Sequence, residues 1–170
     1  MRNPFLTLEE VGSSLRIFVD APIFIYHFTG VSNECRSFLE RCERSDLKAL
    51  TSIVTVAEVA HRLMTIEAVT RGLVSPGNVA KKLRERPEIV AKLETYQQQV
   101  ERIPLMSIEV LPLDLGVFLR SGRLRTECGL LVNDSLAAAT ALERNVTAIA
   151  SSDPDFERVK ELDWYRPADI

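Results

Sequence analysis

Short apolar segments and longer amphipathic stretches alternate along this chain, and the two patterns predict different elements. Four short segments predict strands, at 17–19, 48–54, 107–112 and 147–150. The clearest of them, Ile17 to Val19, has the composition of a strand that is covered on both faces. Stretches with apolar residues three or four positions apart separate the segments and predict helices. The alternation favours an α/β fold in which helices connect the strands of a mostly parallel sheet.

The helical stretches are described by the residues predicted to face inward. These are Cys35, Phe38, Leu39 and Cys42 in the first, Val56, Val59, Ala60 and Leu63 in the second, and Leu115, Phe118, Leu119 and Gly122 in the helix at 114–126. The second helix is predicted to begin at about Thr55, because Thr55 and Glu58 match the capping-box pattern. Asn133 is the predicted N-cap of a later helix, which runs to Leu142.

A charged, helix-prone segment interrupts the alternation between the second and third predicted strands. Residues 66–106 form this enlarged helical segment, and prolines and a glycine divide it into two predicted helical pieces. Residues 1–14 are predicted to be an N-terminal tail with one turn of helix. At 170 residues and 46% hydrophobic composition, the chain has the size of one domain. We therefore expect a single domain over residues 1–170.

Charge and cysteine content argue against several classes of protein. The 21 basic and 24 acidic residues give a net charge of -3, so any contact with nucleic acid has to be local. Three cysteines without a C-x-x-C pair argue against a disulfide framework and a zinc ribbon, and they fit a reducing compartment. Neither an apolar run of about 18 residues nor a signal-peptide pattern occurs, so we expect no membrane span and a cytoplasmic protein.

Four acidic residues fall where predicted strands end or predicted helices begin, and these are Asp20, Glu58, Asp134 and Asp153. Taken singly, each has a structural explanation as a helix cap or a first-turn acid. In a parallel sheet with right-handed crossovers, however, these positions lie at one edge, so the carboxylates would meet in one pocket. Like charges held so close repel unless a cation lies among them. Hard oxygen ligands favour Mg²⁺ or Mn²⁺, which support phosphodiester hydrolysis.

The segments around these acids resemble those of PIN-domain ribonucleases, and in particular of VapC-type toxins from prokaryotic toxin–antitoxin pairs. The resemblance covers most of the chain and rests on four segments. They are FVDAPIFIY around Asp20, TSIVTVAEV around Glu58, NDSLAAATAL around Asp134 and SSDPDFERV around Asp153. The resemblance implies a PIN-like (Rossmann-like) three-layer sandwich, with a mostly parallel central sheet flanked by helices.

The same resemblance implies an activity and a set of roles. The four acids would hold Mg²⁺ or Mn²⁺ and act as the catalytic residues of an enzyme that hydrolyses phosphodiester bonds in RNA. Ser151 and Asp155 would support them without contacting the metal directly. The implied partners are a cognate antitoxin protein and a second copy of the chain in a homodimer.

Pro22 is the main departure from the resemblance, because the family usually has Asn, Ser or Thr near this position. Proline offers neither a polar side chain nor a backbone N–H there. This departure favours a second hypothesis, a catalytically weak PIN-like module that binds RNA or protein without turnover. A haloacid-dehalogenase-type phosphatase is a third hypothesis, which we discount because it would need an aspartate at position 22.

Local basic residues have to hold the RNA if the protein is a nuclease. Arg120, Arg123 and Arg125 are the predicted substrate-binding residues, because their helix end precedes the Asp134 helix by a short connection. They also suit a helix C-terminus electrostatically, so a structural role is equally open. The next candidates are the basic residues of the enlarged segment, Lys81, Lys82, Arg84 and Arg86.

Overall fold

The computed structural model describes residues 6–170. Within these residues all strands belong to one six-stranded sheet, and each neighbouring pair is parallel. In spatial order the strands are β1 (Leu6–Thr7), β6 (Asp163–Arg166), β5 (Ala148–Ala150), β2 (Arg16–Val19), β3 (Lys48–Ser52) and β4 (Ile108–Leu111). The predicted α/β fold with a parallel sheet is confirmed.

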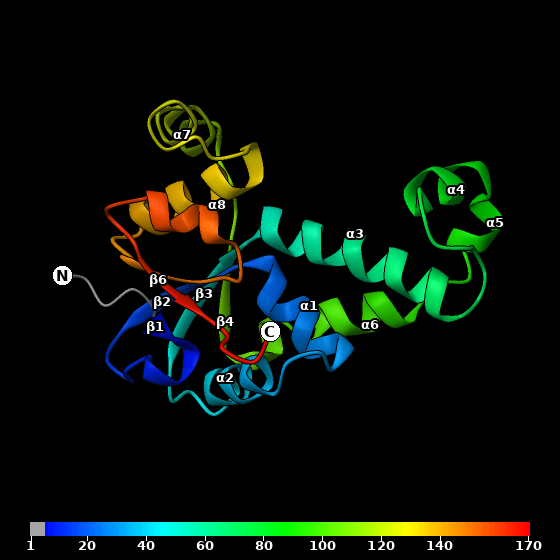
Figure 1. Cartoon of the computed structure of the whole chain (residues 1–170), viewed down its shortest axis with the longest axis horizontal. Helices are drawn as coiled ribbons and strands as arrows, with labels where there is room; N and C mark the ends of the chain where they lie inside the picture. The colour runs from blue at the N-terminus through cyan, green and yellow to red at the C-terminus, as the bar shows by residue number, and fades with distance from the viewer. Residues whose placement is uncertain (1–5) are drawn as a thin grey trace.

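Helices cover both faces of the sheet and complete a three-layer sandwich (Figure 1). One face is covered by α1 (Ala21–Thr29), α2 (Asn33–Glu43) and α3 (Ile53–Thr70). The other face is covered by α8 (Val132–Glu143), and α7 (Leu115–Cys128) packs against α8. The 3₁₀ helices of the described residues are η1 (Leu8–Glu10), η2 (Pro104–Met106) and η3 (Pro154–Arg158).

The central strand β2 is buried on both sides. Ile17 and Val19 lie in the core beneath α1 and α2, whereas Phe18 lies in the core beneath α8. All three side chains are 0% exposed. A strand covered on both faces has to be apolar at every position, and this requirement explains the unbroken run. The strand predicted from the sequence is confirmed.

Helix α3 begins at Ile53, not at about Thr55, and a different residue caps it. Ser52 is the N-cap, and its Oγ accepts a hydrogen bond from the backbone N–H of Thr55 at 3.2 Å. Thr55 is itself buried in the first turn. The predicted capping box of Thr55 and Glu58 is therefore wrong, because Ser52 offers the same hydroxyl chemistry three residues earlier, directly at the end of β3.

The enlarged segment forms a projecting helical arm (Figure 1). Helix α6 (Thr95–Glu101) packs along α3, while α4 (Val79–Glu85) and α5 (Pro87–Val90) lie at the far end of the arm. The prediction of two helical pieces is wrong, because α3 continues to Thr70 and turns separate three shorter helices in this part of the described chain. A separate small core stabilises the far end, with Ala68, Val74, Leu83, Ile89 and Leu93.

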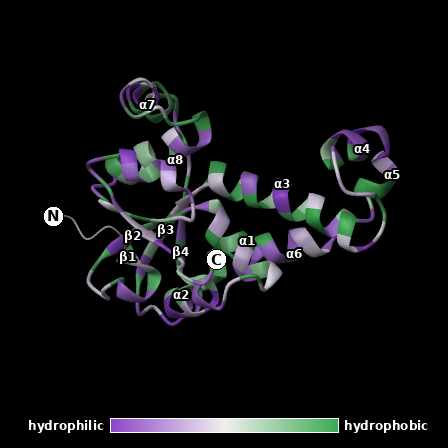
Figure 2. Ribbon diagram, viewed as in Figure 1, coloured by the Kyte–Doolittle hydropathy of each residue, from purple (hydrophilic) through white to green (hydrophobic). Residues whose placement is uncertain are grey.

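Hydrophobic and hydrophilic residues alternate along α3 (Figure 2). At 18 residues α3 is the longest helix of the described chain. Neither α3 nor any other described helix combines the length and the apolar character needed to cross a membrane.

Helix α7 presents the opposite face from the one predicted. Leu115, Phe118 and Leu119 were expected to face inward, but they are 70%, 40% and 65% exposed. The side chains of α7 that are buried instead are Val117, Ser121 and Leu124. The Ser121 hydroxyl donates to the backbone carbonyl of Phe118 at 2.6 Å and accepts from Arg125 at 2.7 Å. Because its hydrogen bonds are satisfied, this more polar face can be buried.

The edge strand β1 and its neighbour β6 are not predicted by the sequence analysis. Strand β1 pairs with β6 and is formed by residues assigned to the tail, while η1 provides the one helical turn that was predicted there. The Glu34 carboxylate of α2 accepts hydrogen bonds from the backbone N–H groups of Leu8 and Ala168. It thereby ties the segments that follow β1 and β6 to the helical layer.

The strand order creates a crevice at the centre of the sheet. From β2 the chain proceeds to one side through β3 and β4, and it then returns to the other side through β5 and β6. Strands β2 and β5 are therefore neighbours at a topological switch point, where the loops at their carboxyl ends diverge. The residues that follow these two strands, Asp20 and Ser151, border this crevice.

Candidate active site

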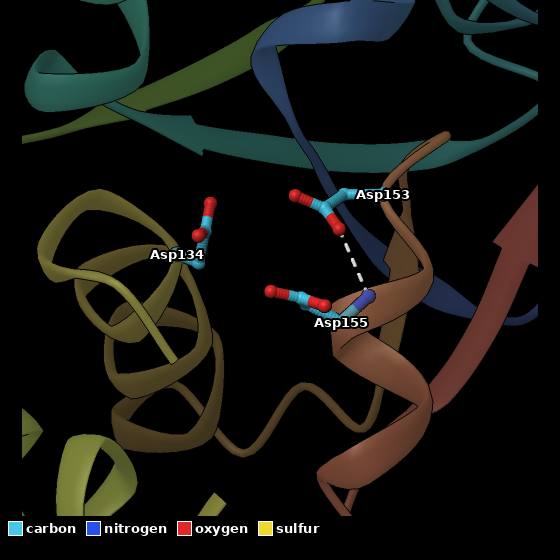
Figure 3. A group of neighbouring side chains, drawn as sticks. All are labelled: Asp134, Asp153 and Asp155. Carbon is cyan, nitrogen blue, oxygen red and sulfur yellow. Dashed lines mark hydrogen bonds between the residues drawn. The ribbon is translucent and has the colours of Figure 1, made fainter. Parts of the chain in front are cut away.

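The acidic residues chosen from the sequence lie together at the carboxyl end of the sheet. Asp20 follows β2, Glu58 lies in α3, Asp134 lies in the first turn of α8, and Asp153 lies between β5 and η3. Carboxylate oxygens of Asp134, Asp153 and Asp155 all lie within 4.8 Å of one another. Figure 3 shows these three side chains pointing toward a common space, and we call them the acidic group.

A tight turn sets the position of Asp153. Asp153 is the N-cap of η3, and its Oδ1 accepts a hydrogen bond from the backbone N–H of Asp155 at 2.9 Å (Figure 3). Pro154 occupies the start of η3, where its missing N–H would have had no helical partner. The same turn brings Asp155 back beside Asp153, so one Asp-Pro-Asp segment supplies two members of the acidic group.

Ser151 connects the ends of the two central strands. Its Oγ donates to Oδ2 of Asp20 at 2.6 Å and accepts from the backbone N–H of Asp153 at 3.0 Å. This hydrogen bond orients Asp20 without help from position 22. Pro22 lies in the first turn of α1, where a helix leaves its backbone N–H groups without internal partners, so the proline removes no helical hydrogen bond.

Asp20 is the most deeply buried of these acids, at 7% exposed. Burial raises the pKa of Asp20 to about 7, although hydrogen bonds from Ser151 and the Ala21 backbone lower the pKa. The negative charges of Glu58 and Asp134 raise it further. The ionised form of Asp20 is therefore unfavourable at neutral pH unless a positive charge lies close by.

The pKa of Asp134 is raised for similar reasons. Burial raises the pKa of Asp134 to about 6, and the charge of Asp153 is the next largest cause. Glu58 and Asp155 act in the same direction, whereas the nearby Arg158 guanidinium opposes them. Two carboxyl groups of the site thus hold their protons more tightly than exposed aspartates do, as expected for carboxyl groups that are buried near other negative charges.

Glu58 lies beside the acidic group, and Asn133 connects the two. The Nδ2 of Asn133 donates to Oε2 of Glu58 at 3.1 Å, across the space between α8 and α3. The predicted N-cap role of Asn133 is wrong, because α8 begins at Val132 and Leu131 is its N-cap. Asn133 instead faces α3 and helps to hold Glu58 near Asp134.

Asp155 is the third member of the acidic group. One of its carboxylate oxygens lies within 4.8 Å of oxygens from both Asp134 and Asp153. Arg158 pairs with Asp155, at 2.6 Å between Nη2 and Oδ2, so the site already contains one compensating cation. The Asp-Pro-Asp spacing is the sequence signal for this arrangement, because a 3₁₀ turn can bring carboxylates two residues apart together.

Comparison with known proteins identifies the family. The family model of the PIN domain matches residues 17–162 of the chain. The chain belongs to the PIN domain family. PIN domains are typically nucleases and generally use a divalent metal.

Solved structures share the PIN fold of this chain. One is VapBC2 from Rickettsia felis bound to a DNA fragment from their promoter, with a TM-score of 0.58, 18% identity, and coverage of 89% of this chain and 98% of that chain. Another is PAE2754 from Pyrobaculum aerophilum, with a TM-score of 0.53, 15% identity, and coverage of 88% and 90%. At these identities the likeness shows the fold alone. A search of curated proteins finds no match.

The donor set of this PIN domain fits a divalent cation. Carboxylate oxygens are the ligands that Mg²⁺ and Mn²⁺ prefer. After burial, the charges of neighbouring carboxylates also raise the pKa values of Asp20 and Asp134, so several acidic groups act on one space. The acidic group is the set of residues that could hold the ion. Asp20 and Glu58 lie near enough to act on it electrostatically, since their charges already act on one another.

Two of the arginines predicted to bind substrate form ion pairs within the PIN domain. Arg120 lies 2.9 Å from Glu143, and Arg123 lies 3.2 Å from Glu161. Glu143 is the last residue of α8 and Asp134 lies in its first turn, so Arg120 is separated from the acidic group by roughly 13 Å along the helix.

Arg125 is the best placed of the three arginines. Its Nη1 donates to the hydroxyl of Ser135, the residue after Asp134, at 3.0 Å. Its guanidinium also lies over the ring of Phe118, 5.5 Å from the centroid. A role of Arg120, Arg123 and Arg125 in RNA binding stays a prediction.

Proposed function

We propose that this PIN domain is a metal-dependent endoribonuclease and acts as the toxin of a prokaryotic toxin–antitoxin pair. The observation that carries the proposal is the acidic group at the carboxyl end of the sheet, with Asp20 and Glu58 beside it. Clustered carboxylates with raised pKa values suit a site that holds a cation, and they repel an anionic substrate in its absence. Membership of the PIN family supports a nuclease.

The residues of the site would have different roles in hydrolysis. Bound Mg²⁺ or Mn²⁺ would supply an acidified water and neutralise charge on the phosphate. Asp134, Asp153 and Asp155 would hold the ion. Asp20, oriented by the Ser151 hydroxyl, and Glu58, oriented by Asn133, would add negative charge that strengthens its binding. Water breaks the phosphodiester bond in this scheme, so no side-chain nucleophile is required.

The toxin assignment is supported by the four acidic motifs and by the fold shared with the VapBC2 structure. An antitoxin protein would then be the partner, and the cytoplasm the compartment. The alternative is a PIN-like module that binds RNA or protein without turnover. Pro22 favoured that alternative because it cannot orient Asp20. Ser151 orients Asp20 instead, and Pro22 fits the first turn of α1, so Pro22 no longer argues against catalysis.

A homodimer is the proposed oligomeric state, and the outer face of α7 supports it. Leu115, Phe118 and Leu119 form an exposed apolar stripe, which Gly122 continues at helical spacing. Gly122 has no side chain to separate two helices, and the large apolar side chains beside it provide surface to bury between them. The same face on a second copy would therefore be a suitable partner for this stripe.

Leu119→Lys is accordingly expected to convert the dimer to a monomer, because it places a charge in the centre of the stripe. Leu105→Lys is the matched control, since Leu105 is 75% exposed in η2 and lies outside the stripe. Sedimentation velocity measures the mass of each variant. A wild-type protein that is monomeric at micromolar concentration would contradict the dimer.

Metal removal tests the proposed function. The purified protein is expected to cut a labelled single-stranded RNA in Mg²⁺ or Mn²⁺, to lose this activity in EDTA, and to regain it when the metal is restored. Gel electrophoresis of the fragments measures cleavage. Cleavage that continues in EDTA would exclude the metal-dependent mechanism, whereas RNA binding without any cleavage in either metal would support the binding module.

A further inference from the structure

An RNA strand that reaches the acidic group has to be held by cations near it, and the inference below rests on the proposed function. The net charge of -3 provides no general attraction, so local cations have to provide it. Arg166 is a cation at the carboxyl end of β6, on the same edge of the sheet as Asp153. It was not among the substrate-binding residues predicted from the sequence.

A small polar pocket at this edge adjoins the acidic group. Its volume is about 230 Å³, and its lining consists of Tyr26, Ser152, Arg166, Pro167 and Ile170. Ser152 links the pocket to the site, because it lies between Ser151, which binds Asp20, and Asp153 of the acidic group. Sites that enclose a whole small-molecule ligand usually have volumes of about 300 to 1,000 Å³, so this pocket suits a single phosphate group.

Tyr26 and Arg166 offer hydrogen-bond donors to the pocket. The Oγ of Ser152 donates to the hydroxyl oxygen of Tyr26 at 3.4 Å, and no acceptor for the tyrosine's own proton is found among residues 6–170. The guanidinium of Arg166 lies over the indole ring of Trp164, with its Cζ 5.6 Å from the ring centroid. This contact with the indole restrains the guanidinium, so Arg166 loses less side-chain freedom on binding.

Strand β6 fixes Arg166 relative to the loop that carries Asp153. Trp164 donates from Nε1 to the backbone carbonyl of Ser151 at 2.8 Å. The backbone carbonyl of Tyr165 accepts a hydrogen bond from the N–H of Ser151 at 2.9 Å. The residue whose side chain orients Asp20 is thus bonded to both residues that precede Arg166, and these bonds hold the end of β6 beside the segment that carries Asp153.

We propose that the pocket of Tyr26, Ser152 and Arg166 binds the phosphate group next to the scissile phosphate in a single-stranded RNA. A guanidinium edge and a hydroxyl donor match the oxygens of a phosphodiester, and contacts of this kind fix the register of a strand without reading its sequence. The positive charge lies outside the acidic group, so it attracts the strand without displacing the metal. Arg166 is therefore a binding residue that positions the RNA for cleavage.

RNA binding by a cleavage-deficient protein tests the pocket. In an Asp134→Asn background, a short labelled oligouridylate is titrated over a series of salt concentrations. Arg166→Gln is expected to weaken binding about tenfold and to reduce the slope of log affinity against log salt by about 0.7, the value for one phosphate contact to a single strand. Arg166→Lys, which keeps the charge, is expected to retain the slope. Tyr26→Phe is expected to weaken binding about threefold with the slope unchanged.

Arg16→Gln is the matched control, because Arg16 begins β2 at the opposite edge of the sheet. It is expected to change neither affinity nor slope. In the active protein, Arg166→Gln is expected to raise KM and to leave kcat within about twofold, as for a contact made equally in the ground and transition states.

Unchanged affinity and slope in Arg166→Gln would contradict phosphate binding in the pocket. An equal loss of RNA affinity in Arg16→Gln would contradict it as well. If Arg166→Gln does not fold, unchanged affinity in Tyr26→Phe would overturn it instead. These results would leave the proposed function standing provided that the wild type still cleaves RNA. A wild-type protein that neither binds nor cleaves RNA would defeat the proposed function and the pocket together.

Discussion

Asp134→Asn is expected to lower the Mg²⁺-dependent rate of RNA cleavage by about three orders of magnitude. Asparagine keeps the shape of the side chain but removes one of the three charges of the acidic group. The fold is expected to survive, because the pKa of Asp134 is raised to about 6 and the loss of its charge relieves repulsion. Single-turnover cleavage of a labelled RNA measures the rate, and circular dichroism checks the fold.

Glu143→Gln is the matched control at the other end of α8. It removes the same kind of charge and breaks only the exposed ion pair with Arg120, which contributes less than about 1 kcal/mol. Its cleavage rate is expected to stay within about twofold of the wild type. Wild-type cleavage by folded Asp134→Asn would remove Asp134 from the active site.

Asp20→Asn is expected to stabilise the metal-free protein at neutral pH, even though it should reduce activity. Burial raises the pKa of Asp20 to about 7 in the folded protein, whereas an exposed aspartate has a pKa of about 4. The folded state therefore binds this proton more tightly than the unfolded state. The resulting stability is fully present below about pH 4 and is lost as the pH rises through about 7.

Ionisation of Asp20 in the folded protein lowers the free energy of unfolding by on the order of 4 kcal/mol. For a chain of this size the decrease corresponds to roughly 10 °C in Tm. Ionisation of Asp134, whose pKa is raised to about 6, lowers the free energy of unfolding further. Asparagine at position 20 cannot ionise, so the Tm of Asp20→Asn should exceed that of the wild type near pH 8 in EDTA. The difference should narrow near pH 5, where wild-type Asp20 is protonated.

Thermal unfolding near pH 5 and near pH 8, in EDTA and in Mg²⁺, measures these differences. Mg²⁺ should raise the Tm of the wild type, because a ligand that binds only the folded state stabilises it, and should raise that of Asp20→Asn less. A Tm for Asp20→Asn below that of the wild type near pH 8 in EDTA would show that ionised Asp20 does not destabilise the folded protein.

The strand β2 and the acid at its end could be predicted from the sequence because both depend on local composition. An unbroken apolar run can be buried only between two layers, and parallel strands then bring Asp20 to the same edge as the start of α8. The resemblance to PIN domains is carried by the same segments, so family and fold followed together.

The orientation of α7 and the position of Asp155 could not be predicted in this way. The stripe of Leu115 and Leu119 has the same helical period as the buried face, and the choice between them depends on the hydrogen bonds of Ser121. Asp155 enters the acidic group only because η3 turns tightly after Pro154. The position of Arg166 depends on the pairing of β6 with β1 and β5, and such pairing leaves little recognisable pattern in the sequence of β6 itself.

The most direct measurement of the metal site is anomalous scattering from crystals soaked in Mn²⁺. Wild-type crystals are expected to show a peak within about 2.0 to 2.6 Å of carboxylate oxygens from at least two of Asp134, Asp153 and Asp155, with no peak there in Asp134→Asn. A wild-type structure in which Mn²⁺ binds elsewhere and leaves this acidic group empty would contradict the proposed active site.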